Sequence, residues 1–294
     1  MAIMPEFPTI TVVIPALNEQ QHIDACLDSL HSQSYPSDRY SVVVVDNGST
    51  DKTPEMVQAK GVRLLHEPRK SAFWARNLAI ENSESDWLAF TDADCLADRD
   101  WLTNLVRCAS GRDAMLVGGL ISYDMVFDTL GNRLLMETHQ PDQLRRTIED
   151  HHSVASGNMF VRRDAFEMHG LFNVIAWGSD IDFSKRIAEQ NHVVAFAEDA
   201  MVTHQCDLSN WEYWRRSFET RYGQVLLFDQ RQGWLAAARN FVSIPWRPGF
   251  RGGVNRYSTE EIKKAPAISD WLYRWVNRWM EFFGEQMALI KKTK

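Results

Sequence analysis

Three features that would classify a protein quickly are missing from this 294-residue chain: a long apolar segment, a disulfide framework and an excess of basic residues. The longest uncharged apolar stretches, such as Ala114–Tyr123, have about ten residues, whereas a helix that spans a bilayer needs about 20. The first ten residues lack the basic region and the apolar run of a signal peptide. The formal net charge of −7 argues against general nucleic-acid binding. We therefore expect a cytoplasmic globular protein that does not bind nucleic acid.

The cysteines are few and show no CxxC spacing: Cys26, Cys95, Cys108 and Cys206. We interpret them as buried thiols of a cytosolic protein, and not as disulfide partners or zinc ligands. Apolar residues make up 45% of the chain and charged residues 24%, which is the balance of a globular protein with a sizeable core.

Strand and helix patterns alternate along the first hundred residues. Apolar runs predict four buried strands, at Ile10–Pro15, Val42–Val45, Val62–Leu65 and Trp87–Phe90. Between them, an apolar stripe with helical spacing begins at Ile23, and a further helix is expected over Ala72–Ile80. This alternation predicts a parallel sheet, in which ligands bind at the carboxyl ends of the strands.

Polar residues stand at three of these strand ends. Asn18 and Glu19 follow the first strand, Asp46 follows the second, and Asp92 and Asp94 follow the fourth. One such cluster would be read as a turn. Three such clusters at one sheet edge would bring several carboxylates together, and a cation would stabilise them. The Asp92-Ala-Asp94 spacing suits Mg²⁺ or Mn²⁺ bound next to a diphosphate.

Four motifs in this order resemble the inverting family 2 glycosyltransferases: PALNE, VVVVDNGSTD, KSAFWARN and FTDAD. The resemblance runs from about Ile10 to about His204. It implies the GT-A fold, a mostly parallel Rossmann-like sheet flanked by helices, here with a helical C-terminal extension. We expect a catalytic domain over residues 1–206, with the nucleotide-sugar half at about 1–100 and the acceptor half at 101–206, followed by the extension at 207–294.

The resemblance also implies roles for individual residues. Asp46 would bind the base or ribose of the donor, Asp92 the ribose or a metal-bound water, and Asp94 the Mg²⁺ or Mn²⁺ ion. Pro15, Asn18 and Glu19 would line the nucleotide pocket, and Arg76 and Asn77 would contact the nucleotide or help to order the site.

The second half of the domain should supply a base and an acceptor site. The stretch beginning Gly157-Asn158 resembles the family's GxN strand, and the acceptor site is assigned to Asn158, Trp177 and Gly178. The family's catalytic Glu-Asp pair falls on Ser179-Asp180, so Asp180 is the expected base and Ser179 is a departure. His204 has two interpretations, a ligand of the metal or diphosphate and a structural histidine.

These assignments predict transfer of one sugar from a nucleotide sugar, most commonly a UDP-sugar, to a hydroxyl of a glycan or lipid-linked acceptor in envelope or polysaccharide synthesis. The QxxRW motif of processive synthases is absent from the sequence. A sugar-nucleotide pyrophosphorylase would need a glycine-rich cationic loop after the first strand, where this chain has ALNEQ. A degenerate nucleotide-sugar-binding scaffold or sensor remains an alternative, for which Ser179 is the one favourable residue.

The C-terminal third differs from the rest of the chain in its charge and its tryptophan content. Residues 205–294 contain nine acidic and 15 basic residues, and seven of the eleven tryptophans. A helix is predicted over Asn210–Gln230, and Trp271, Trp275 and Trp279 recur with helical spacing. Three interpretations stay open: peripheral contact with the inner face of a membrane, packing on the catalytic domain, and a homodimer interface. The Pro245–Gly253 loop is a hypothetical lid over the diphosphate.

Overall fold

The structure is a computed structural model, and the chain divides into two compact units. The first unit consists of Met1–Val126, Leu135–Ile175 and Ser179–Cys206, and the second of Phe127–Leu134, Ala176–Gly178 and Asp207–Lys294. The structure describes residues 7–125, 132, 135–136, 139–175, 177–206, 209–228, 276–277, 279–281, 283–285, 287–288 and 291.

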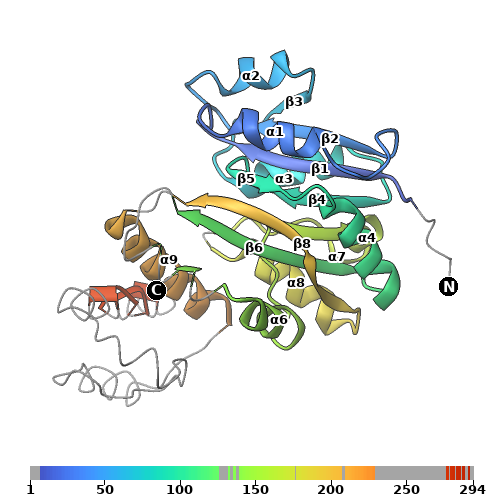
Figure 1. The fold of residues 1–294 in the computed structure, drawn as a ribbon. Helices are drawn as coiled ribbons and strands as arrows, with labels where there is room; N and C mark the ends of the chain where they lie inside the picture. The colour runs from blue at the N-terminus through green and yellow to red at the C-terminus, as the bar shows by residue number, and fades with distance from the viewer. Residues whose placement is uncertain are drawn as a thin grey trace, which may run out of the picture. The chain divides into compact units, whose positions relative to one another are not determined.

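The first unit is built on an eight-stranded sheet of order β3-β2-β1-β4-β7-β6-β8-β5 (Figure 1). Its strands are β1 Ile10–Ala16, β2 Tyr40–Asp46, β3 Arg63–His66, β4 Trp87–Thr91, β5 Cys95–Ala97, β6 Leu116–Met125, β7 Asn158–Arg162 and β8 Val194–Cys206. The parallel arrangement predicted for the first hundred residues holds for β1 to β4. The whole sheet is mixed, because β7 pairs antiparallel with β4 and β6, and β5 pairs antiparallel with β8.

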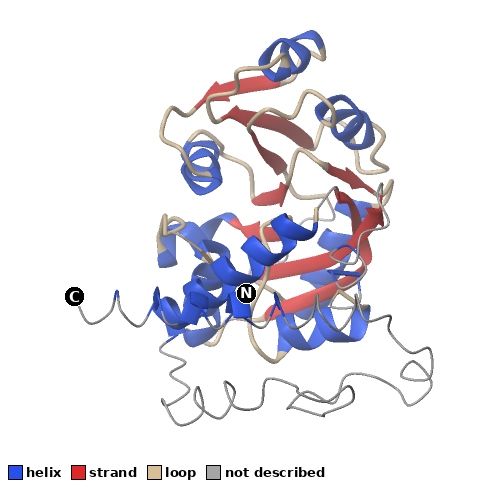
Figure 2. Cartoon of the chain, turned by 90° about the vertical axis from the view of Figure 1, so that its left-hand side faces the viewer, coloured by secondary structure: helices blue, strands red, loops and turns tan. Residues whose placement is uncertain are grey.

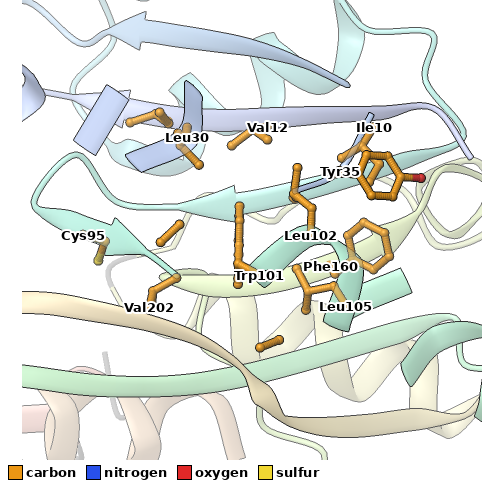
Figure 3. Packing of buried hydrophobic residues seen from close by; sticks show 14 of the residues in the cluster. Ile10, Val12, Leu30, Tyr35, Cys95, Trp101, Leu102, Leu105, Phe160 and Val202 are labelled. Carbon is orange, nitrogen blue, oxygen red and sulfur yellow. The ribbon is translucent and has the colours of Figure 1, made fainter. Parts of the chain in front are cut away.

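Helices lie on both sides of the strands (Figure 2). Those of the first unit are α1 Ile23–His31, α2 Thr53–Ala59, α3 Ala72–Glu81, α4 Trp101–Arg112, α6 Pro141–Glu149, α7 Arg163–His169 and α8 Ser179–Glu189. The two-residue period of a strand divides the apolar side chains into two layers. Val12 packs with α1 and α4 in one layer, and Val13 packs with α3, α7 and α8 in the other. Figure 3 shows the first layer, in which Phe160 of β7 lies among the residues of α4 and β1.

An irregularity between β6 and β8 places one polar side chain inside the sheet. Gly119 pairs with Ala197, but the next residue, Leu120, pairs with Met201, so β8 has three extra residues at this point. The Asn158 amide group lies there and donates to the Leu120 and Ala200 carbonyl oxygens, both at 2.9 Å. A Cβ atom on Gly119 would be 2.3 Å from the Asn158 Nδ2 atom, which explains the glycine.

The second unit contains α9, Asn210–Phe228, where the sequence predicted a helix over 210–230. Gly284 contacts this helix so closely that a Cβ atom would be 2.4 Å from the Phe218 carbonyl oxygen. Arg221 and the buried Glu285 form an ion pair at 2.9 Å. No helix among the described residues is long and apolar enough to cross a membrane. Trp271, Trp275 and the Pro245–Gly253 loop lie outside the described residues.

Candidate active site

Four potential metal ligands meet where β4, β5 and β8 come together. Asp92 and Asp94 lie in the tight turn after β4, which is closed by the Cys95 N–H donating to the Asp92 carbonyl oxygen at 3.1 Å. The antiparallel pairing of β5 with β8 places Cys95 directly opposite His204. The donor atoms of Asp92, Asp94, Cys95 and His204 all lie within 4.8 Å of one another. Asp92 and Asp94 therefore lie in one cluster of donor atoms with His204 and Cys95.

The carboxylates in this cluster are only partly balanced by positive charge. Arg76, which is 4% exposed on α3, binds the Asp92 Oδ1 atom at 2.5 Å. His204 Nε2 lies 3.3 Å from Asp94 Oδ2. Burial raises the pKa of Asp94 and the Asp92 charge adds to this rise, while His204 acts against it. Burial likewise raises the pKa of Glu19, which also feels the charges of Asp92 and Asp94.

A divalent cation fits this arrangement. Carboxylate oxygens are the ligands that Mg²⁺ and Mn²⁺ prefer, and Mn²⁺ also accepts an imidazole nitrogen. Burial raises the pKa of Asp94, so a bound cation would favour the charged form of that carboxyl group. Room for Asp92 depends on Gly157, because a Cβ atom there would lie 3.1 Å from the Asp92 Oδ2 atom.

The second predicted carboxylate site lies at the end of β2. Asp46 is 5% exposed, and its carboxylate accepts hydrogen bonds from the Ser49 N–H at 3.1 Å and the Gly48 N–H at 3.3 Å. His66 of β3 lies at 3.3 Å. Burial acts to raise the pKa of Asp46, but these hydrogen bonds outweigh it and lower the pKa, so the carboxylate stays charged.

The loop after β1 lies beside Asp46. Pro15 and Ala16 pair with Val45 and Asp46 in the parallel register of β1 and β2. Asn18 has a positive φ of 60° and its side-chain oxygen accepts the Thr50 N–H at 2.8 Å, which joins the two loops. The structure therefore brings Pro15, Asn18 and Asp46 to one sheet edge, as the strand order requires.

Two residues assigned to binding are engaged inside the fold. The Asn77 side chain donates to the Phe172 carbonyl oxygen at 2.9 Å and accepts the Phe172 N–H at 3.1 Å. Asn158 is 1% exposed, and besides its two donor bonds it accepts from the Trp101 indole N–H at 2.9 Å. Both amides hold the protein together, and neither is open to a substrate in this structure.

Asp180 lies at the start of α8, where its Oδ2 atom accepts the Ser156 N–H at 2.8 Å and its Oδ1 atom accepts the Ile181 N–H at 2.9 Å. Ser156 precedes Gly157, where a Cβ atom would lie 3.1 Å from the Asp92 Oδ2 atom. The Ser156–Gly157 segment thus links Asp180 to the carboxylate cluster. Trp177 and Gly178 fall in the second unit, separate from the unit that contains Asp180.

Sequence reasoning missed Cys95 and His22. Cys95 was expected to be a buried thiol without a role as a ligand, yet its Sγ atom belongs to the donor cluster. Its position directly after Asp94 was the available signal. His22 forms a pair with Glu19 at 3.1 Å and so positions that carboxylate.

Comparison with known proteins agrees with this geometry. The family model described as glycosyl transferase family 2 matches residues 11–170. The glycosyltransferase AglE of Haloferax volcanii is 32% identical over 98% of both chains. A dolichyl N-acetyl-alpha-D-glucosaminyl phosphate 3-beta-D-2,3-diacetamido-2,3-dideoxy-beta-D-glucuronosyltransferase of Methanococcus voltae is 26% identical, over 33% of each chain.

The fold also has a solved counterpart. The mannosyltransferase PcManGT of Pyrobaculum calidifontis, determined in complex with GDP-Man and Mn²⁺, superposes with a TM-score of 0.67 over 98% of this chain and 88% of its own, at 19% identity. The mixed sheet described above is thus a GT-A fold. With the family model matching more than half of the sequence and AglE aligning along nearly all of it, this chain belongs to glycosyl transferase family 2.

Proposed function

We propose that this glycosyltransferase uses a divalent metal ion to transfer one sugar, with inversion, from a nucleoside-diphosphate sugar to an acceptor hydroxyl. The observation that carries the proposal is the cluster of Asp92, Asp94 and His204 at the sheet edge that also presents Asp46. Residues 1–206 would form the catalytic domain and residues 207–294 the extension.

Different residues of the chain would bind the nucleoside, hold the metal ion and position the donor. Asp46, Asn18 and Pro15 would hold the nucleoside of the donor at the ends of β1 and β2. Asp94 and His204 would hold Mg²⁺ or Mn²⁺, which when bound would neutralise the departing diphosphate. Asp92, fixed by Arg76, would position the donor next to it.

Asp180 is the residue proposed to accept the proton of the acceptor hydroxyl. Its two backbone hydrogen bonds fix the carboxylate, and each oxygen retains a lone pair for a further donor. Because a diphosphate is a good leaving group once its charge is neutralised, one base suffices. Attack from the face opposite the diphosphate would invert the anomeric centre.

The acceptor is proposed to be a glycan or a lipid-linked sugar. Support comes from the Methanococcus voltae relative, whose name describes transfer to a dolichyl phosphate sugar. The basic, tryptophan-rich extension would suit such an acceptor, through peripheral contact with a membrane surface. The intact set of Asp46, Asp92, Asp94 and Asp180 argues against an inactive scaffold.

The donor site is tested by thermal melting with UDP and with GDP, each with and without Mn²⁺. Both nucleotides are needed, because UDP is the common family donor and the PcManGT complex contains GDP-Man. A nucleotide at 100 times its dissociation constant stabilises by about 2.7 kcal/mol, which raises the melting temperature by a few degrees. We expect one nucleotide to raise the melting temperature of the wild type only when Mn²⁺ is present. The same nucleotide with Mn²⁺ should not raise the melting temperature of Asp94→Ala. No shift with either nucleotide would contradict the proposed donor site.

The base is tested with a matched pair of variants on α8. Asp180→Asn should lower kcat by about 10²- to 10⁴-fold while nucleotide binding is retained. Asp182→Asn removes a neighbouring carboxylate that pairs with Arg186 at 3.1 Å, and activity should survive. Proton NMR of the product then reports the anomeric configuration. Retention of the donor configuration, or equal loss in both variants, would contradict the assignment.

A further inference from the structure

The donor cluster contains one atom that hard cations do not need. Mg²⁺ and Mn²⁺ prefer oxygen ligands, which Asp92 and Asp94 supply, and Mn²⁺ also accepts an imidazole nitrogen such as that of His204. Cys95 adds a sulfur atom, 3.8 Å from Asp94 Oδ1. Thiolate sulfur is a ligand for soft and borderline ions such as Cd²⁺ and Zn²⁺.

The distances suit a four-coordinate ion. Zinc–ligand bonds of about 2.0–2.3 Å put tetrahedral donor atoms about 3.3–3.8 Å apart. The Asp94 Oδ2 to His204 Nε2 distance is 3.3 Å, and the four donor atoms, one from each residue, all lie within 4.8 Å of one another. The Cys95 Sγ atom is 3.8 Å from Oδ1, the other oxygen of Asp94. Side-chain movements of about 1 Å would therefore complete a tetrahedral shell.

Burial shows how an ion would reach the sulfur. The side chains of Asp92, Asp94 and His204 are 36%, 25% and 16% exposed, and Cys95 is 1% exposed. The carboxylates and the imidazole thus form the accessible side of the cluster, and the thiol forms its innermost part.

We propose that Asp92, Asp94, Cys95 and His204 form a mixed oxygen–nitrogen–sulfur site that binds Zn²⁺ or Cd²⁺ through the Cys95 thiolate. The thiol proton passes to solvent as the metal–sulfur bond forms. Four protein donors fill a tetrahedral shell and leave no position for diphosphate oxygens, so the bound ion inhibits transfer. The inference rests on the metal site of the proposed function, and adds to it a class of inhibitory ion.

The test is a titration of the intact protein with Cd²⁺, followed by ultraviolet thiolate-to-cadmium charge-transfer absorption, and a parallel titration with Mn²⁺ followed by electron paramagnetic resonance. Cys95→Ser should abolish the absorption and weaken Cd²⁺ binding about tenfold or more, with Mn²⁺ affinity retained. Cys26→Ser is the matched control, because Cys26 is equally buried and its thiol donates to the Asp92 carbonyl oxygen, yet it lies outside the donor cluster.

The possible negative results distinguish the role of Cys95 from the metal site itself. Equal Cd²⁺ binding in wild type and Cys95→Ser, or no thiolate absorption in wild type, overturns the role of Cys95 while Mn²⁺ binding leaves the proposed function standing. Absence of Mn²⁺ binding in wild type contradicts the metal site itself. If Cys95→Ser does not fold, as judged by circular dichroism, Cys95→Ala replaces it, and the cadmium-113 NMR shift of the wild type reports sulfur ligation without any variant.

Discussion

Replacing Asn158 with alanine should destabilise the protein strongly, because this amide is shared by three elements. The side chain is 1% exposed and bonds to Trp101 of α4, Leu120 of β6 and Ala200 of β8. Alanine would remove the acceptor of the Trp101 indole N–H and the donor to the Leu120 and Ala200 carbonyl oxygens. Each such group costs about 1–3 kcal/mol, so the simple sum is about 3–9 kcal/mol.

Relaxation of the irregular segment between β6 and β8 and entry of water would reduce that sum. We expect the free energy of unfolding to fall by about 4 kcal/mol. For a chain of this size each kcal/mol lowers the melting temperature by about 2–4 °C, which gives a fall of about 10 °C. The assay is urea unfolding followed by far-ultraviolet circular dichroism, with an unchanged m-value as evidence that both states are comparable.

Two further variants separate a structural role from acceptor binding. Asn158→Asp keeps the volume and can accept from Trp101, but its carboxylate cannot donate to Leu120 and Ala200, so it should be at least as unstable as the alanine variant. Trp101→Phe removes one hydrogen bond and should cost less. A loss below about 1 kcal/mol in Asn158→Ala, together with a higher acceptor KM, would refute the reasoning.

Three glycine and asparagine substitutions give further tests. Gly119→Ala places a Cβ atom 2.4 Å from the Ala200 carbonyl oxygen, and should lower the free energy of unfolding in urea by about 1–3 kcal/mol. An unchanged free energy of unfolding would contradict the close approach of β6 and β8 at this glycine. Gly157→Ala puts a Cβ atom 3.1 Å from Asp92 Oδ2, and should weaken Mn²⁺ binding, measured by paramagnetic resonance, more than it lowers stability. Asn77→Ala leaves both Phe172 backbone groups unpaired, and should lose about 2–4 kcal/mol while the nucleotide dissociation constant, measured by calorimetry, stays unchanged.

The N-terminal half of the sheet could be predicted because its signals are local. Runs such as Val42–Val45 are long enough to indicate a strand, and β1, β2 and β4 form where they were expected. Parallel strands then bring their carboxyl ends together regardless of side-chain detail. This is why Asp46, Asp92 and Asp94 could be placed at one edge from the sequence.

The second half depends on contacts that no local pattern encodes. In the sequence, Glu198 and Asp199 interrupt the apolar pattern between residues 193 and 202, which favours two short strands over one. The structure has one strand, β8, in which those acids pair with Arg145 at 2.6 Å and Arg107 at 3.0 Å. β5 has three residues and exists because β8 lies beside it. The ligand role of Cys95 follows from that same pairing.

Ser179 bears on how many bases the reaction has. The residue is fully buried, and its hydroxyl accepts the Ile175 N–H at 3.3 Å at the start of α8. A carboxylate in this position would be a buried charge, which is costly unless a cation pairs with it. Serine meets the local need for an acceptor without charge, and leaves Asp180 as the carboxylate that the start of this helix holds toward Ser156. The departure from the family's Glu-Asp pair therefore simplifies the proposed chemistry to a single base, and loss of transfer in Asp180→Asn should not be rescued by any acid at residue 179.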